Sequence, residues 1–345
     1  MMFDYSDTLN LPLIWAGLVA LAVFIYAALD GFDLGCGLLF PFAPSDDARS
    51  RIMNSIAPFW DGNETWLILG GGGLLAAFPV AYGVILSGLY IPVIIMLFGL
   101  IFRGVAFELR FKSHSSLFIW DMAFFVGSLL AAFMQGVMLA TIVQGMPVEN
   151  RVFAGGGFDW LTPFSLLGGL AVVAGYALHG STWLIMKTHG DLQKWAALAA
   201  EYAALGLAIA LVALSVVTPL LDTEGTRRLY QLPNMLFLAP LPVITVVMFF
   251  WMRNTLKVIQ KRQIRREYLP FLLSFVVFIL GFVGLIFTVF PYIIPYEMTF
   301  EQAAATGPSL SIMLIGAGVM LPIILAYTAF GYYVFRGKSD SKPMY

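Results

Sequence analysis

The stretch IAPFWDGNETWLILGGGGLLAAFP, residues 56–79, is long and apolar enough to cross a bilayer, yet it carries ionisable side chains near its start. Asp61 and Glu64 are three residues apart and therefore share one face of a helix. A carboxylate in hydrocarbon costs a few kcal/mol, so an ionisable residue inside a span indicates a functional site. The glycine run from Gly70 to Gly73 allows another helix, or a flat ligand, to approach the backbone closely.

The composition indicates a polytopic membrane protein. The chain has 345 residues, of which 60% are hydrophobic and 11% are charged, whereas about a quarter of the residues of a soluble domain are charged. The net charge is −1 and no basic tract stands out, which argues against a nucleic-acid partner. No Lys or Arg precedes the first apolar run, so a cleaved signal peptide is not expected. The single cysteine, Cys36, excludes an internal disulfide and a Cys-ligated cluster.

Nine apolar segments predict an all-α protein with about nine transmembrane helices. Each span needs about 20 apolar residues and must pair its backbone groups internally. We expect a tight turn around Pro79 between the second and third spans. The chain would form a single transmembrane domain, residues 1–345, with an acid-rich first half (1–144) and a second half (145–345) that serves as scaffold and partner surface. The predicted spans are residues 11–40, 56–78, 80–107, 117–144, 161–186, 197–220, 235–253, 268–293 and 308–335.

The distribution of Lys and Arg predicts the orientation of the spans. The loops after spans one, three, five and seven, together with the C-terminal tail, hold 16 of these residues, and the opposite side holds three. We therefore expect the N-terminus outside (periplasmic) and the C-terminus in the cytoplasm. The 16 are Arg49, Arg51, Arg103, Arg110, Lys112, Lys187, Lys194, Arg253, Lys257, Lys261, Arg262, Arg265, Arg266, Arg336, Lys338 and Lys342, and the three are Arg151, Arg227 and Arg228.

This orientation brings six carboxyls from four consecutive spans to the cytoplasmic side. They are Asp30, Asp33, Asp61, Glu64, Glu108 and Asp121. Acids spaced along a path into the protein are what a proton relay needs, and Arg103 is expected to neutralise one of them. Asp61, which follows Trp60, is the first candidate for proton transfer. A simple role at a helix end stays an alternative, above all for Glu108 and Asp121.

Histidine usage argues against haem ligation by this chain. His114 and His189 fall in predicted loops, and only His179 lies within a span, so two in-span histidines for a haem do not exist here. A lone histidine in a span is more often a hydrogen-bonded packing group. We find no metal-binding, phosphate-binding or Ser/His/Asp motif in a credible context. The spacing Gly31-x-x-x-Gly35 predicts close packing of the first span against another helix.

Several stretches closely resemble subunit II of the cytochrome bd-type ubiquinol oxidases, including the cyanide-insensitive branch. They are DGFDLG at 30–35, NSIAPFWDGNETWL at 54–67 and FRGVAFE at 102–108, and HGSTW at 179–183 fits the same family. Span count, length and orientation agree, so the resemblance covers essentially the whole chain. Some members of the family have Asp where this chain has Glu108.

The resemblance implies a complex in the bacterial cytoplasmic (inner) membrane that oxidises quinol and reduces dioxygen to water. It implies a homologous, haem-bearing subunit I as partner, which holds most of the haem b and haem d (or haem b in its place). A small single-helix subunit is a further candidate partner, membrane lipids surround the complex, and a structural quinone is a candidate cofactor. Trp60 and Asp61 map onto a motif whose Asp lines a cytoplasmic proton channel at the subunit interface.

In this interpretation Asp61 transfers protons, Glu64, Asp30, Asp33 and Glu108 are secondary members, and Arg103 is their charge partner. Two alternatives stay open. A stand-alone proton-coupled transporter would also tolerate buried acids, although such transporters usually show internal repeats. A purely structural subunit would use the acids to fix helix packing.

Overall fold

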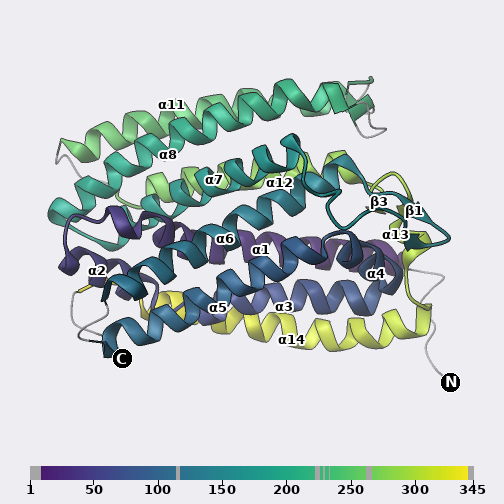
Figure 1. Ribbon diagram of the computed structural model, residues 1–345, viewed down its shortest axis with the longest axis horizontal. Coiled ribbons are helices and arrows are strands. Elements are labelled where there is room, and N and C mark those ends of the chain that lie inside the picture. The colour runs from purple at the N-terminus through teal and green to yellow at the C-terminus, as the bar shows by residue number, and fades with distance from the viewer. Residues whose placement is uncertain are drawn as a thin grey trace.

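The computed structural model describes residues 9–113, 117–221, 226–227, 230–232, 234–261 and 266–340. The N-terminal residues 1–8 and the predicted loop residues His114, Arg228, Arg262, Arg265 and Lys342 lie outside these ranges. The described part is an elongated bundle of helices that run nearly parallel to one another (Figure 1). This arrangement confirms the predicted all-α fold.

Eight helices in the described ranges are long and apolar enough to cross a membrane. They correspond to eight of the nine predicted spans. The remaining span is also a helix of 18 residues, but its first turns carry the polar residues Asp61, Asn63 and Glu64, and it is not among the eight. The long helices are α1 Leu11–Leu39, α3 Trp60–Ala77, α5 Tyr90–Lys112, α6 Leu117–Gln144, α7 Pro163–Lys187, α8 Gly190–Val217, α11 Pro240–Gln260, α12 Leu269–Val289 and α14 Gly307–Val334.

Short elements connect these helices at the two ends of the bundle. Ser45 caps α2 by accepting a hydrogen bond from the Ala48 N–H, and Thr162 and Ser165 form a capping box at the start of α7. Two small hairpins, β1–β2 and β3–β4, lie at the end opposite α2 (Figure 1). The short elements are η1 Phe40–Phe42, α2 Asp46–Ile56, α4 Pro79–Gly88, β1 Val148–Glu149, β2 Val152–Phe153, η2 Thr218–Leu221, α10 Asn234–Leu238, β3 Tyr292–Ile294, β4 Met298–Thr299 and α13 Phe300–Ala303.

The predicted boundaries are wrong around the second and third spans. Ile56 ends α2 rather than beginning a span, and residues 80–107 are not one helix. Pro79 instead starts the separate helix α4, which packs beside β2 and β3, and α5 begins only at Tyr90. Proline suits the first turn of a helix because its missing N–H has no partner there in any case. The chain therefore reverses through α4 and not through a tight turn at Pro79.

Helix α1 lies at the centre of the first half and packs on α3, α6 and α7. Its crossing with α7 depends on glycine, because a Cβ at Gly35 would overlap the backbone oxygen of Tyr176, and a Cβ at Gly31 would meet the Tyr176 ring. This confirms the close packing predicted from Gly31 and Gly35. On the other side, Gly70 and Gly73 of α3 allow close approach to Val23 and Val19 of α1.

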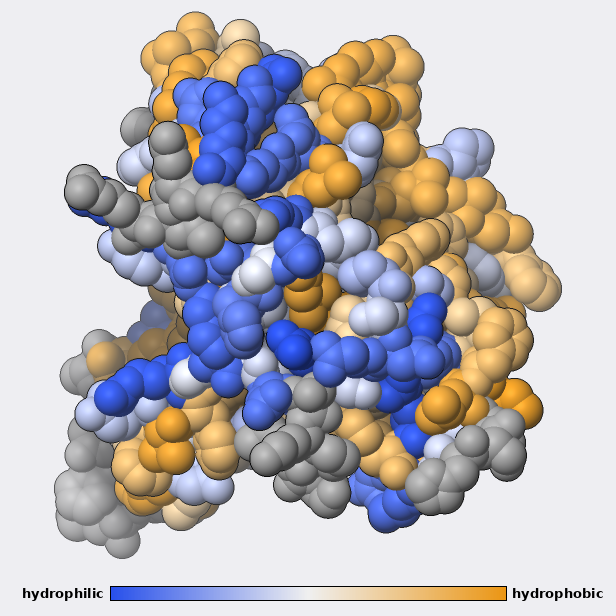
Figure 2. Space-filling view, turned by 90° about the vertical axis from the view of Figure 1, so that its left-hand side faces the viewer, coloured by the Kyte–Doolittle hydropathy of each residue, from blue (hydrophilic) through white to orange (hydrophobic). Residues whose placement is uncertain are grey.

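Hydrophilic residues gather at one end of the bundle. Figure 2 views that end directly and shows blue residues across its centre, with hydrophobic residues on the flanks. The end is formed by α2, the last turns of α5 and α7, the start of α8 and residues 336–340, and we call it the basic end. Its Lys and Arg side chains include Arg49, Arg51, Arg110, Lys187, Lys194 and Lys338.

Candidate functional site

Asp30 and Asp33 of α1 are buried, each with 0% exposed surface. They lie nine and six residues before the end of α1 at Leu39, which places them roughly 13 and 9 Å along the helix from the basic end. Both lie where α1 packs against its neighbours, so their carboxyl groups cannot reach water or headgroups directly. Carboxyls in such a place need partners from the surrounding helices.

Arg103 of α5 supplies one partner and joins three helices. Its side chain is 2% exposed, its Nη1 lies 2.5 Å from Oδ1 of Asp30, and its Nη2 lies 3.0 Å from Oε2 of Glu64. The guanidinium fork suits two carboxylates at once, which a lysine cannot match. Arg103 also lies 5.9 Å from the ring centroid of Trp60. Asp30 and Glu64 are therefore the two acids that Arg103 contacts.

Asp33 has a different partner. The side-chain amide of Asn63 donates a hydrogen bond of 2.7 Å to Oδ2 of Asp33 and one of 3.3 Å to the carbonyl oxygen of Leu29. The other end of the Asn63 amide accepts a hydrogen bond of 2.9 Å from the hydroxyl of Tyr332 on α14. Asn63 thus links the acid-bearing helix α1 to the last helix of the chain.

We call Asp30, Asp33, Asn63, Glu64 and Arg103 the acid cluster. Two of its buried carboxyl oxygens, Oδ2 of Asp30 and Oδ1 of Asp33, have no hydrogen-bond partner within the described residues. A buried acceptor without a donor is costly, and the cost is removed when the carboxyl binds a proton or a water molecule. Both acids are therefore equipped to accept a proton at an oxygen that is not already engaged.

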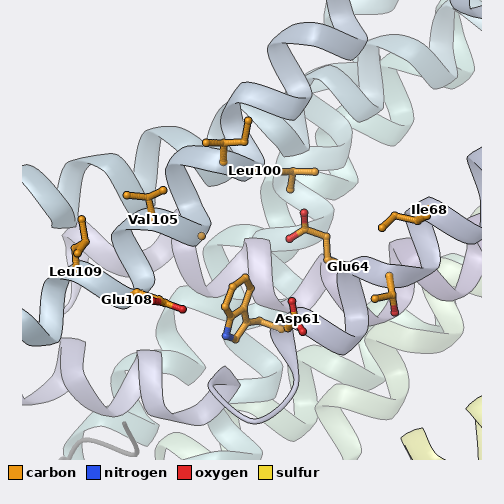
Figure 3. Close-up of a pocket in the computed structure, with 11 residues that line it drawn as sticks. Asp61, Glu64, Ile68, Leu100, Val105, Glu108 and Leu109 are labelled. Carbon is orange, nitrogen blue, oxygen red and sulfur yellow. The ribbon is translucent and has the colours of Figure 1, made fainter.

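A groove of about 590 Å³ lies at the surface between α3 and α5, and Glu64 is the member of the acid cluster that lines it. Asp61 and Glu64 project into it from α3, and Glu108 lines it from α5 (Figure 3). The two α3 acids therefore share one face, as predicted. Asp61 is exposed in this chain, whereas the Glu64 side chain is 30% exposed and also reaches Arg103. Glu64 is thus the residue common to the groove and the buried cluster.

The remaining walls of the groove are apolar and include Ile68, Leu100, Val105 and Leu109. Trp60 forms part of the groove and stacks at 32° to Phe107, with ring centroids 5.2 Å apart. An exposed acid on an otherwise apolar, membrane-spanning face is unfavourable against lipid. This face is therefore suited to being covered by another protein.

A second polar chain leaves the acid cluster toward the interior. Tyr176 of α7 donates a hydrogen bond of 2.6 Å to the Gln135 carbonyl oxygen, and the Gln135 amide donates one of 2.9 Å to the Tyr26 hydroxyl. Tyr26 lies one turn before Asp30 on α1. Sequence reasoning missed this chain; the spacing Tyr26 to Asp30 on one helix face was its only local signal.

The six predicted acids do not form one cluster. Asp121 pairs instead with Arg110, at 2.6 Å, and lies 3.6 Å from Arg49, nearer the basic end. The Glu108 side chain is 66% exposed and its nearest basic partner is Lys112, one helical turn away at 3.7 Å. The prediction grouped the six acids by their depth in the membrane alone. Asp121 and Glu108 project from their helices in other directions and therefore have other partners.

His179 does not fit a haem ligand in this structure. It is fully buried, with Nδ1 2.7 Å from the Ser274 hydroxyl and Nε2 3.0 Å from the Ala28 carbonyl oxygen. A carbonyl oxygen only accepts, so Nε2 carries the proton, and neither ring nitrogen is free for iron. His179 joins α1, α7 and α12 as a packing group. The described residues hold no cluster of three or more His, Cys, Asp or Glu side chains that could bind a metal ion.

Comparisons with known proteins agree with the resemblance. Residues 11–335 match the family described as cytochrome bd terminal oxidase subunit II. The chain is 33% identical over 343 residues to the cytochrome bd ubiquinol oxidase subunit 2 of Bacillus subtilis, which covers 96% of this chain and 98% of that one. It is 31% identical over 379 residues to the cytochrome bd-I ubiquinol oxidase subunit 2 of Escherichia coli K12, with 98% and 96% covered. The bd oxidase from Geobacillus thermodenitrificans contains a chain of the same fold, with a TM-score of 0.75 and 18% identity over 95% of this chain and 99% of that one.

Proposed function

This chain belongs to the cytochrome bd terminal oxidase subunit II family, and from that premise we propose that it carries protons from the groove between α3 and α5 toward the oxygen-reducing centre of its complex. The complex is a respiratory ubiquinol oxidase, an oxidoreductase. The matches give no support for the stand-alone transporter. The proposal concerns what this subunit's own residues contribute to the reaction.

The observation that carries the proposal is the continuity of acids from the surface to the interior. Asp61 is exposed in the groove, and Glu64 lies in both the groove and the ion-paired cluster. Asp30 and Asp33 then hold the unpaired carboxyl oxygens inside. A proton would bind first at Asp61, pass to Glu64 one turn along the same helix face, and reach Asp30 by way of water, while Arg103 stays protonated and holds the two carboxyls close to each other. Water molecules in the groove would bridge the gaps between these groups.

The haems belong, in this proposal, to a partner subunit. The fixed ring nitrogens of His179 support this division of labour, because this chain offers no free in-span histidine among the described residues. We propose the homologous subunit I as the partner, bearing haem b and haem d or a second type of haem b, with its surface covering the groove. The haems would pass the electrons of quinol to dioxygen. Asp61, Glu64 and Glu108 of this chain would hold protons at the covered interface.

The orientation and location are part of the same proposal. Basic residues gather at the end of the bundle that carries α2 and residues 336–340 (Figure 2), and such residues favour the cytoplasmic side. The groove acids lie toward that end, so protons would come from the cytoplasm. The membrane would be the bacterial inner membrane, with the N-terminus on the periplasmic side. The exposed glycines Gly71 and Gly72 leave open space against α3, which would admit a structural quinone or a small accessory helix.

The substitution Asp61→Asn tests the proposal because it keeps the shape of the side chain and removes its titration. We expect an assembled complex with its haems and with oxygen consumption per haem about a hundredfold slower, the lower end of the roughly 10²–10⁴-fold range attributed to a positioned proton-transfer group. Asp191→Asn is a matched control, since the Asp191 side chain is 93% exposed at the start of α8, away from the groove. A wild-type rate in Asp61→Asn would rule out proton delivery through this residue.

The structural alternative predicts a different result. If the acids only fix helix packing, neutralising Asp61 or Glu64 lowers the yield of the complex but leaves the rate per assembled complex unchanged. The visible reduced-minus-oxidised spectrum of each preparation gives the haem content, so the yield and the rate per complex are measured separately.

A further inference from the structure

Helix α14 contacts the acid cluster through one polar side chain. The helix lies at the edge of the bundle, where most of its residues are exposed and Leu310 is its one buried residue in the described range. Tyr332, near its end, is instead turned inward. Its ring stacks on Phe59 at 10° with centroids 4.4 Å apart, and its hydroxyl donates to Asn63.

The hydrogen bonds of Asn63 determine how its amide is oriented. One side faces two groups that can only accept from it, the Asp33 carboxylate oxygen and the Leu29 carbonyl, so this side must be the NH₂ group. The opposite side is the oxygen, which accepts from Tyr332. Asn63 is 1% exposed. Without the Tyr332 hydroxyl, the buried Asn63 oxygen loses this donor, and only the bonds to Asp33 and Leu29 then orient the amide.

The position of Tyr332 is itself fixed by the residues that follow it. Nζ of the buried Lys187 donates to the carbonyl oxygens of Phe335 and Gly337, at 2.5 and 2.9 Å. Lys338 pairs with Glu267 and donates to the Thr188 carbonyl oxygen at 2.8 Å. The end of α14 is thus tied to α7 at the basic end, directly beside the stacked ring.

We propose that Tyr332 is a positioning residue for the proton relay. It acts through Asn63 to hold the Asp33 carboxyl in one orientation, with Oδ2 engaged and Oδ1 open to a proton. The tie between Lys187 and residues 335–337 keeps Tyr332 in register with Asn63. This inference rests on the proposed function, because it assigns a task to Asp33 within that relay. It gives the second half of the chain a part in the site beyond that of a scaffold.

The test is a double-mutant cycle on the purified complex, built from Tyr332→Phe, Asp33→Asn and the two together. Tyr332→Phe keeps the stacked ring and removes only the hydroxyl. We expect roughly fivefold slower oxygen consumption per haem in this variant, the rate equivalent of one neutral hydrogen bond. If Tyr332 acts through Asp33, the double variant turns over at the rate of Asp33→Asn alone. Losses that multiply would overturn the inference.

Tyr333→Phe is the matched control, because Tyr333 is 64% exposed on the next position of the same helix. It should turn over at the wild-type rate. If Asp33→Asn fails to assemble, a second measurement tests the positioning role of Tyr332. The carboxyl bands in redox-difference infrared spectra should shift in Tyr332→Phe and not in Tyr333→Phe, and identical bands in both variants would contradict the positioning role.

The outcomes separate the inference from the proposed function. A wild-type rate in Tyr332→Phe, combined with a slowed Asp61→Asn, would remove Tyr332 from the relay and leave the groove pathway intact. Wild-type rates in both Asp61→Asn and Asp33→Asn would remove the proposed function itself, and the inference would fall with it.

Discussion

Replacing Arg103 by Gln should impair both the stability and the turnover of the complex. Arg103 is buried and holds Asp30 at 2.5 Å and Glu64 at 3.0 Å. Removing one partner of a buried ion pair costs about 3–5 kcal/mol, because the remaining charge is left uncompensated. That is a factor of roughly one hundred to several thousand in an equilibrium constant. We therefore expect low yield, and thermal denaturation in detergent at a clearly lower temperature.

Arg110→Gln provides a matched comparison seven residues further along α5. Arg110 is also buried and lies 2.6 Å from its carboxylate partner Asp121, but Asp121 would keep Arg49 at 3.6 Å. Its loss should therefore destabilise the complex less. Oxygen consumption per haem should fall in Arg103→Gln and stay at the wild-type value in Arg110→Gln. Equal turnover losses in the two variants would refute the reasoning, because disturbed packing of α5 would then explain both.

Two further predictions concern helix packing. Gly35→Ala should prevent assembly, because the added Cβ would overlap the Tyr176 backbone. Gly17→Ala should leave the yield unchanged, since nothing lies within 4 Å of the added atom. Equal yields of the two variants would contradict the close crossing of α1 and α7. His179→Gln should lower the free energy of unfolding by about 1–3 kcal/mol, because the hydrogen bonds to Ser274 and Ala28 are lost. The visible haem spectrum of the complex should be unchanged. A missing haem band would mean that His179 binds iron.

Hydrophobic length predicted most of the fold because a bilayer imposes it directly. Each long apolar run had to become a helix, and glycine pairs marked where helices cross closely, as at Gly31 and Gly35. The boundary between α4 and α5 was missed because residues 79–102 carry no charged side chain, so hydropathy does not mark the break at Leu89. Helix α2 was missed for the opposite reason: its sequence is polar enough to resemble a loop, although its apolar face packs into the core.

The sequence predicted those features of the site that depend on residue spacing within one helix or on depth in the membrane. Spacing placed Asp61 and Glu64 on one face, and a single arginine at the same depth predicted the charge partner. The direction of a side chain around its helix axis cannot be read from its depth, which is why Asp121, which pairs with Arg110, was grouped with the acids near Arg103. Tyr332 is 269 positions from Asn63. No local pattern predicts a hydrogen bond over that distance.

Charge balance distinguishes the two arginine clusters of α5. Asp121 lies between Arg110 and Arg49, so that cluster is compensated without any proton. Arg103 contacts two carboxyls, those of Asp30 and Glu64, and the nearby Asp33 bonds to the neutral Asn63 instead. An uncompensated negative charge at this depth is unfavourable, so the second cluster approaches neutrality only by binding protons. In the proposed relay, the same imbalance that makes the Arg103 cluster costly as a purely structural device would let protons bind and leave there, and the Arg110 cluster lacks this imbalance.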